Sequence, residues 1–398
     1  MYYRPRCLIL NTYTPYASIY TMGQDILAAV RELGFSATES LQGNYTDPKL
    51  FEAMMLMMGQ FQGKGFVFEF NGRNNQKVIN PKVGQKSLYD EWKLPKVCWL
   101  TDNPSHHMEN LCNLPDYSIL GVVDRDFLDW LPSCGLSTRR TFFMPHAGPP
   151  PLPQQALTAE RELDVLFFGN IAKVPSASDW ANSIVGDNPD RQRCLLQAID
   201  CCLQTDKGFF ETLSTVFDDA DMELSLTEKL YFVSKLEAYV IARRRLDILS
   251  GIKRSRVTVF GNVNPAVQAQ FGPNIVFRNT ATFEDFQDFA MNAKIVLNLS
   301  TSFRNGAHER VFYGLSRGAH ILTERSRFLA QEVSADLGIS FLDFDAMQAD
   351  DAIERVLDLG NSLDDQRERA LTHYAGNHLW KNRIEDALDI LEQEYWNT

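Results

Sequence analysis

The fold is decided where the chain runs Asp164-Val165-Leu166-Phe167-Phe168-Gly169, a short apolar segment that ends at a glycine. The segment Arg256-Val257-Thr258-Val259-Phe260-Gly261 repeats this pattern. Short apolar runs of this kind predict strands that are buried on both faces. Between the two segments lies a long stretch of largely helical pattern. The combination predicts a parallel sheet that is covered by helices.

Further strand candidates lie on both sides of these two segments. Toward the C-terminus they are 274–277, 295–299, 320–323 and 339–342, and toward the N-terminus they are 6–10, 65–70, 96–100, 118–123 and 140–144. Helical patterns separate them, as between Tyr20 and Leu33, where Gly34 provides a helix C-cap. The alternation of strands and helices predicts an α/β protein with two Rossmann-like domains.

A proline-rich segment divides the chain into two parts. Residues 145–153 contain five prolines in nine positions, which favours an extended connector, or hinge, over a helix or a central strand. We therefore predict an N-terminal domain at 1–150 and a second domain at 151–380, with a helical insertion at about 172–250. A C-terminal helix at 381–398 is a candidate for crossing back to the first domain. A length of 398 residues suits two domains.

The composition excludes several classes of protein. With 44% apolar and 23% charged residues, the chain is typical of a globular protein. Its net charge of -12 argues against a nucleic-acid partner, because phosphate backbones are bound by basic surfaces. The longest apolar run, at 53–58, is too short to span a membrane. The seven cysteines lack paired C-x-x-C spacing, and we predict mostly buried thiols in a reducing cytoplasm and no metal site.

The most informative loop lies between the strand candidates at 295–299 and 320–323. In open α/β sheets, ligands bind beyond the carboxyl ends of the strands, where this loop is expected. A helix is expected to begin near Ala307, and its N-terminus would offer unpaired N–H groups and a positive dipole end to a phosphate. Arg304, His308 and Arg310 add charge and hydrogen-bond donors around it. The alternative is a surface turn with solvated basic residues.

This loop also carries a family resemblance. Arg310-x-Phe312, followed by Gly314-Leu315-x-x-Gly318-Ala319-x-Ile321-Leu322-Thr323, resembles the donor-site segment of GT-B glycosyltransferases, closest to the spore-maturation CgeB-like branch of the group 1 transferases. The segments 96–104, 142–147 and 164–170 resemble other parts of that branch in the same order. The resemblance implies a GT-B-like fold and a nucleoside-diphosphate sugar as donor substrate, with no further cofactor and no metal.

The resemblance also implies roles for individual residues on the donor side. The helix start from Gly306 to Arg310, together with Arg304, is expected to neutralise the diphosphate. Glu309 or Glu324 is expected to contact the sugar or the ribose. The remaining donor-site candidates are Gly169 and Lys173, in the loop after the strand at 164–168, and Asn305, which stands where the superfamily often has a glutamate. Tyr313 stands where the family has the glutamate that holds the ribose.

Three residues of the N-terminal domain are candidates for handling the acceptor proton. Asp102 and His106 follow the strand at 96–100, and His146 follows the strand at 140–144. A carboxylate or an imidazole at a strand end is suited to act as a general base. The alternatives are helix capping by the segment 102–105 and a hinge histidine that is hydrogen-bonded to the backbone.

The sequence thus predicts a glycosyltransferase that moves a sugar from a nucleoside-diphosphate sugar to an acceptor hydroxyl. The acceptor, whether protein, glycan or small molecule, is not identified by any motif. Two alternatives remain. A nucleotide-sugar epimerase uses the same two-domain frame, although it would need carboxylates on both walls of the cleft. A non-catalytic GT-B-like binding or scaffolding protein is suggested by Tyr313 in place of the family glutamate.

Overall fold

The computed structural model describes residues 5–14, 16–41, 48–59, 61, 65–80, 84–136, 138–153, 160–300, 302–332, 337–360 and 362–397. The chain divides into two compact units. Unit 1 comprises Met1–Pro149, Thr282–Glu284 and Asn377–Thr398, and unit 2 comprises Pro150–Ala281 and Asp285–Gly376. Each unit is described by itself below.

Unit 1 is built on a six-stranded parallel sheet with the order β2-β1-β3-β6-β7-β8. The strands are β1 (Arg6–Asn11), β2 (Ser36–Leu41), β3 (Phe66–Phe70), β6 (Lys96–Trp99), β7 (Ser118–Val122) and β8 (Arg140–Phe143). The central strands β3, β6 and β7 are buried along their whole length, which explains why their sequences are mostly apolar; Glu69 of β3 and Lys96 of β6 are buried charged exceptions. β2 was not expected from the sequence, because it is a polar strand at the sheet edge.

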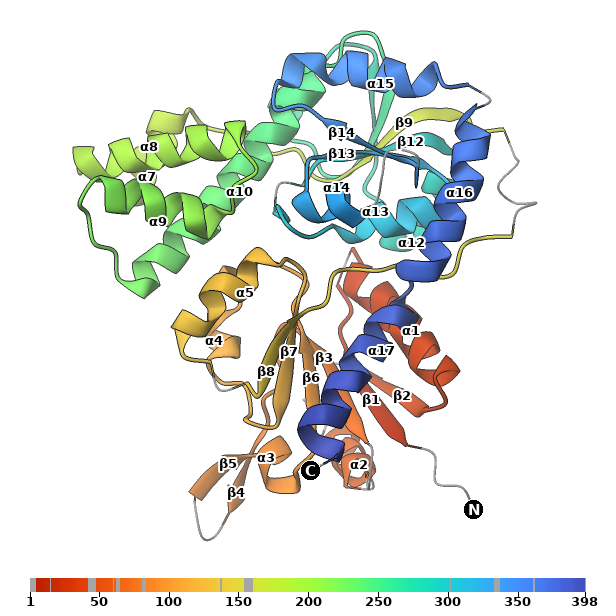
Figure 1. Ribbon diagram of the computed structural model, residues 1–398. Coiled ribbons are helices and arrows are strands. Elements are labelled where there is room, and N and C mark those ends of the chain that lie inside the picture. The colour runs from red at the N-terminus through yellow and green to blue at the C-terminus, as the bar shows by residue number, and fades with distance from the viewer. Residues whose placement is uncertain are drawn as a thin grey trace. The chain divides into compact units, whose positions relative to one another are not determined.

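Helices and a small hairpin complete unit 1. They are α1 (Ser18–Glu32), α2 (Pro48–Met58), the hairpin β4 (Lys77–Asn80) and β5 (Gly84–Ser87), α3 (Leu88–Trp92), α4 (Met108–Leu111), α5 (Asp126–Trp130) and α17 (Trp380–Leu391). Although α17 comes from the C-terminal end of the chain, it packs against α1 (Figure 1). The Trp380 ring lies edge-on to Trp99 at 5.0 Å, so that the C-terminal segment covers part of the core of unit 1.

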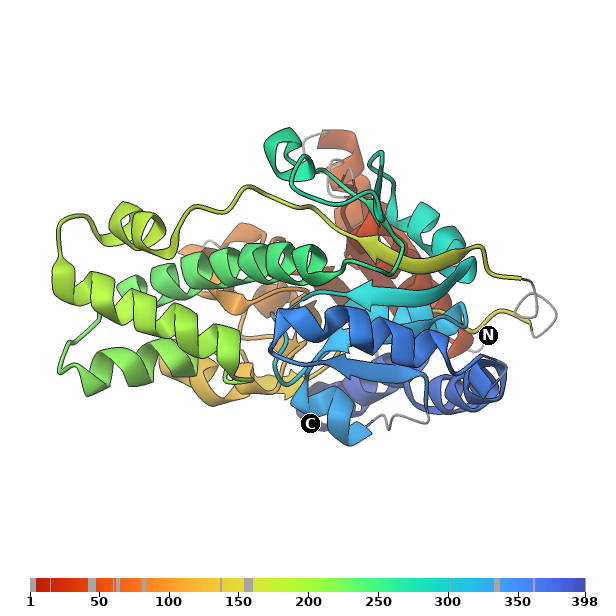
Figure 2. The same ribbon diagram turned by 90° about the horizontal axis from the view of Figure 1, so that it is seen from above.

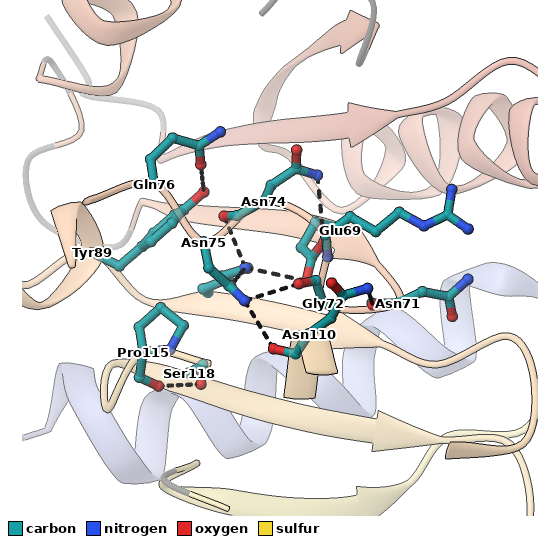
Figure 3. A network of polar contacts seen from close by, with 12 residues as sticks. Glu69, Asn71, Gly72, Asn74, Asn75, Gln76, Tyr89, Asn110, Pro115 and Ser118 are labelled. Atoms are coloured by element: carbon teal, nitrogen blue, oxygen red, sulfur yellow. Dashed lines mark hydrogen bonds and ion pairs between the residues drawn. The ribbon is translucent and has the colours of Figure 1, made fainter. Parts of the chain in front are cut away.

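A buried polar network occupies one end of this sheet (Figure 3). The Lys96 ammonium lies 3.2 Å from Glu69 Oε1 and donates to the Asn74 carbonyl at 3.0 Å and to Asn75 Oδ1 at 2.6 Å. Glu69 Oε2 accepts the Arg73 N–H at 3.0 Å. Because the Lys96 and Glu69 side chains are both completely buried, these hydrogen bonds offset the cost of removing the two charges from water.

Unit 2 has a second six-stranded parallel sheet, with the order β11-β10-β9-β12-β13-β14. Its strands are β9 (Leu163–Phe168), β10 (Val257–Phe260), β11 (Ile275–Arg278), β12 (Ala293–Asn298), β13 (His320–Glu324) and β14 (Ile339–Leu342). The strand order reverses between β9 and β12, and this reversal is the topological switch point of the sheet. The two sheets confirm the α/β prediction.

Helices cover both faces of the second sheet (Figure 1). They are α11 (Pro265–Gln268), α12 (Phe283–Met291), α13 (Glu309–Ser316), α14 (Arg327–Glu332), α15 (Ala349–Leu357) and α16 (Ser362–Asn377). One face forms a core with α15 and the end of α10, where Ile248, Leu249 and Ile353 pack against β9, β10 and β12. The helices α12, α13 and α14 lie on the opposite face.

The predicted helical insertion is a bundle of four helices between β9 and β10 (Figure 2). They are α7 (Ala177–Val185), α8 (Pro189–Gln204), α9 (Phe209–Asp219) and α10 (Leu226–Gly251). The bundle has its own apolar core, which includes Leu195, Phe217 and Leu236. Since α10 contributes both to this core and to the core at the sheet, one continuous helix connects the insertion to the sheet.

Across the described ranges, none of the helices combines the length and the apolar character that a membrane crossing requires.

Candidate functional site

The candidate site lies at the carboxyl edge of the second sheet, where β9 and β10 end in contacting loops. Gly169 N–H donates to the Phe260 carbonyl, and Ile171 forms a parallel bridge with Val263. Gly261 has φ 149°, and a Cβ atom there would lie 2.3 Å from the Gly169 carbonyl oxygen. Only glycine permits this approach. The two loops are therefore held together beside the switch point.

The loop after β12 ends at α13, whose first residue is Glu309. His308 Nδ1 lies 2.7 Å from Glu309 Oε2, and His308 Nε2 lies 2.9 Å from an Arg310 amino group. Since the guanidinium only donates, Nε2 accepts from Arg310 and the Nδ1 proton is directed to Glu309. His308 also stands at the N-cap, 3.4 Å from the Arg310 N–H, but the shorter contact to Glu309 determines the orientation of its ring.

The Arg310 side chain reaches from α13 to the end of β9. Its guanidinium donates to the Phe168 carbonyl at 2.7 Å and to His308, and the residue is only 6% exposed. Its Nε atom is buried and has no hydrogen-bond partner among the described residues. A guanidinium is thus held beside the switch point, where ligands of such sheets bind.

Arg304 makes its contacts elsewhere. Its guanidinium donates to the Cys202 carbonyl of α8 at 2.7 Å and lies 5.7 Å from the centre of the Phe209 ring of α9. Burial lowers the pKa of Arg304, and the neighbouring Glu324 carboxylate opposes that shift. The residue is 3% exposed. Its hydrogen bond therefore goes to the insertion, a contact that the sequence did not predict, and its contact with a diphosphate stays a prediction.

Glu324 ends β13 in a buried ion pair with an insertion residue. Its Oε1 atom lies 2.9 Å from Arg244 Nε, and Arg244 also donates to the carbonyls of Phe344 and Asp343. Glu324 Oε2 is buried without a hydrogen-bond partner in the described part of the chain. The residues in contact are 80 apart in the chain, and no local pattern reveals such a pair.

The other donor-side candidates differ in their placement. Gly306 is buried, and its carbonyl accepts the Ser326 hydroxyl at 2.5 Å. Asn305 and Gly169 are half-buried, and Lys173 is exposed in the loop after β9. The structure thus gathers Gly306, His308, Glu309 and Arg310 around the start of α13. It does not bring the Arg304 side chain into the same hydrogen-bonded group.

The acceptor-side candidates lie in unit 1. The Asp102 side chain is 57% exposed, accepts the Thr101 hydroxyl at 2.9 Å and lies 3.5 Å from His107 Nε2. His106 is exposed to solvent. His146 is 1% exposed, and its ring lies edge-on to Trp99 at 5.0 Å.

Asn71 is a further residue at this edge that sequence reasoning did not single out. Its side chain donates to the Thr101 hydroxyl at 2.9 Å and accepts the Thr101 N–H at 2.8 Å. Its backbone has φ 62°, in the left-handed region that few non-glycine residues adopt. Asn71 thereby fixes Thr101, which in turn binds the Asp102 carboxylate.

Within the described residues, no group of three or more histidine, cysteine, aspartate and glutamate side chains is placed to hold a metal ion.

Comparisons with known proteins identify the fold of the chain but no relative by sequence. No family model matches the sequence, and no curated protein is found to be similar to it. Among solved structures, sucrose-phosphate synthase from Thermosynechococcus elongatus has a TM-score of 0.53 at 9% identity and covers 100% of both chains. A glycosyltransferase involved in avilamycin A biosynthesis reaches 0.51 at 12% identity, with 99% of both chains covered. HepE from Anabaena, in complex with UDP and glucose, reaches 0.51 at 7% identity, with 98% of this chain and 100% of HepE covered.

These structural similarities extend over almost the whole chain. Because the sequence identities are low, they bear on the fold alone. The chain has the two-sheet α/β fold of the GT-B glycosyltransferases, as its sequence predicted.

Proposed function

We propose that this chain is a glycosyltransferase that binds a nucleoside-diphosphate sugar at unit 2, with the diphosphate at the start of α13. The observation that carries the proposal is Arg310, a buried cation beside the switch point. It makes no ion pair with a carboxylate among the described residues, and its Nε atom has no partner there. A buried cation is costly unless an anion neutralises it, and a diphosphate would do so.

The surroundings of Arg310 favour an anion as well. The first N–H groups of α13 and the positive end of its dipole lie next to the guanidinium. The His308–Glu309 pair orients Arg310 from one side, while the Phe168 carbonyl holds it from the other. A guanidinium that is fixed in this way binds phosphate oxygens in two-point geometry with little loss of entropy.

The choice of donor is guided by the structural neighbours. HepE is in complex with UDP and glucose, so a UDP-sugar is the first donor to test here. The sequence of the α13 segment supports placing the chain in the CgeB-like branch. Donor-site chemistry in this proposal uses Arg310 and the helix end, and requires no metal ion.

Unit 1 supplies the acceptor side in this proposal. Asp102 is the proton acceptor for the incoming hydroxyl, because its carboxylate is exposed and yet held by Thr101. His107 Nε2 lies 3.5 Å from this carboxylate. His146 is surrounded by the core of unit 1, and a role for it in proton transfer has less support than one for Asp102.

Thermal unfolding with UDP-, GDP-, dTDP- and CDP-sugars tests the donor site. At 100 times the dissociation constant, the ligand should stabilise the protein by about 2.7 kcal/mol. Wild type should respond to one nucleotide family, and Arg310→Ala should lose the response. Arg193→Ala, which removes an exposed arginine of α8 paired with Asp190, is the matched control and should respond as wild type does. A folded wild type that responds to no nucleotide would refute the proposal.

A non-catalytic binding protein is the second candidate, and Tyr313 favours it. Where the family has a ribose-binding glutamate, Tyr313 is completely buried in α13. Turnover separates the two candidates. A transferase releases the nucleoside diphosphate from the donor that it binds, and Asp102→Asn should slow the release without weakening donor binding. Binding of a donor without any turnover, to water or to a panel of acceptors, would favour the binding protein.

A further inference from the structure

The insertion places an arginine at the switch point of the second sheet. Arg245, on α10, donates from Nε to the Leu299 carbonyl at 3.1 Å and from a terminal nitrogen to the Asn170 carbonyl at 3.2 Å. Leu299 follows β12 and Asn170 follows β9, so the guanidinium connects the carboxyl ends of the two strands between which the strand order reverses. Its central carbon lies 3.7 Å from the position of a Cβ atom built on Gly169.

Arg310 binds the same side of the same strand. The Gly169 N–H points to β10, and carbonyls alternate in direction along an extended strand, so those of Phe168 and Asn170 point to the β12 side. Arg310 binds the first and Arg245 the second. The two guanidiniums therefore bind carbonyls that are two residues apart in the chain, at the end of β9 beside the switch point.

We infer that Arg245 binds the diphosphate of the donor together with Arg310, so that the insertion forms part of the donor site. This inference rests on the proposed function. It brings a residue of α10 into the donor site, for which the sequence offered Lys173 as a candidate; Lys173 is exposed, whereas Arg245 is fixed against two strand ends. It also fits the placement of Arg304, whose guanidinium is bonded to the insertion.

Two contacts hold the insertion, which carries Arg245, against the sheet. Arg244 forms the buried ion pair with Glu324 and binds the carbonyls after β14. From the other direction, Arg304 reaches from the loop after β12 to the end of α8. The adjacent arginines of α10 thus contact the carboxyl ends of β9, β12, β13 and β14, four neighbouring strands of the sheet. An anion site that is fixed before binding loses less entropy when the ligand arrives.

Calorimetric titration with UDP and with uridine tests the inference. Arg245→Gln keeps an N–H donor for the strand-end carbonyls but removes the charge, and should weaken UDP binding about ten- to a hundredfold. Uridine, which lacks the diphosphate, should bind as it does to wild type. Arg245→Lys keeps the charge and should bind UDP more tightly than Arg245→Gln. Arg243→Gln, two residues away on α10 and paired with Asp247, is the matched control and should bind both ligands normally.

The outcomes separate the inference from the proposed function. If wild type binds no nucleotide, both the proposed function and the inference are refuted. If wild type binds UDP, Arg310→Ala does not, and Arg245→Gln still binds UDP as wild type does, the inference alone is overturned. Equal weakening of UDP and uridine in Arg245→Gln also overturns it, because Arg245 would then act only by supporting the loops. If Arg245→Gln does not fold, Arg245→Lys replaces it in the test. A lower affinity for UDP than wild type, with an unchanged affinity for uridine, supports the inference. Equal effects on the affinities for UDP and uridine overturn it.

Discussion

At the scale of single residues, both units contain a buried charge pair. In unit 1 it joins Lys96 to Glu69, and in unit 2 it joins Arg244 to Glu324. Each pair is supported by hydrogen bonds to backbone carbonyls, from Lys96 to Asn74 and from Arg244 to Phe344. Removing one partner of such a pair leaves an uncompensated buried charge, at a cost of about 3–5 kcal/mol. The pairs therefore fix geometry even where their net contribution to stability is small.

His320, at the start of β13, gives stability a dependence on pH. Burial, with Arg367 adding to it, lowers its pKa to about 4, while its Nε2 atom contacts the Ser340 hydroxyl. The unfolded chain takes up this proton first, near pH 6.5, so the contribution of neutral His320 is complete above that pH and is lost as the pH falls toward 4. We expect unit 2 to lose about 2 kcal/mol between pH 7 and pH 5 from this group.

Urea unfolding of wild type and His320→Gln at the two pH values measures this loss. The variant should show a smaller difference between pH 7 and pH 5, and His106→Gln, which changes an exposed histidine, should behave as wild type does. If His320→Gln shows the same difference in the free energy of unfolding between pH 7 and pH 5 as wild type, other groups cause the acid sensitivity.

At the scale of helices and strands, the close contact between the loops after β9 and β10 depends on one residue. Gly261→Ala would place a Cβ atom 2.3 Å from the Gly169 carbonyl oxygen and would strain a backbone at φ 149°. We expect a loss of about 2 kcal/mol or more in the free energy of unfolding and weaker nucleotide binding, because both loops border the switch point. Chemical denaturation measures the first effect and titration with UDP the second.

Gly376→Ala is the matched control for that change. A Cβ atom at this position of α16 meets no described atom within 4 Å, and alanine is favoured over glycine in a helix. Its stability should be unchanged or slightly higher. Equal losses in the free energy of unfolding of Gly261→Ala and Gly376→Ala would mean that the close contact between the loops does not depend on glycine at position 261.

The elements also show what the sequence can and cannot predict. Buried parallel strands have apolar neighbours on both faces, so β9, β10 and β12 are recognisable from their sequences alone. The polar edge strand β2 has no such pattern. His308, Glu309 and Arg310 were predicted as a group because they are adjacent in the chain. The contacts of Arg304 with Cys202 and of Arg245 with Asn170 cross 102 and 75 residues, and no local periodicity encodes them.

At the scale of the whole molecule, the chain folds into two units that each have a sheet and a core. A ligand that binds only the folded form of unit 2 stabilises that unit by mass action. With a saturating nucleotide, amide hydrogen exchange should slow in β9, β12 and α10 more than in β3 and β6. α10 should be protected together with the sheet, since Arg244 and Arg245 connect them. Protection that is equal in both units would contradict a donor site confined to unit 2.

The return of the chain to unit 1 after residue 377 affects the order in which the protein can be completed on the ribosome. Domains generally begin to fold during synthesis, N-terminal ones first. Here the face of Trp99 that Trp380 covers stays open until nearly all of unit 2 has been translated. During that interval the nascent unit 1 exposes an aromatic surface to solvent or to a chaperone. The unit that is translated first is therefore among the last to be finished.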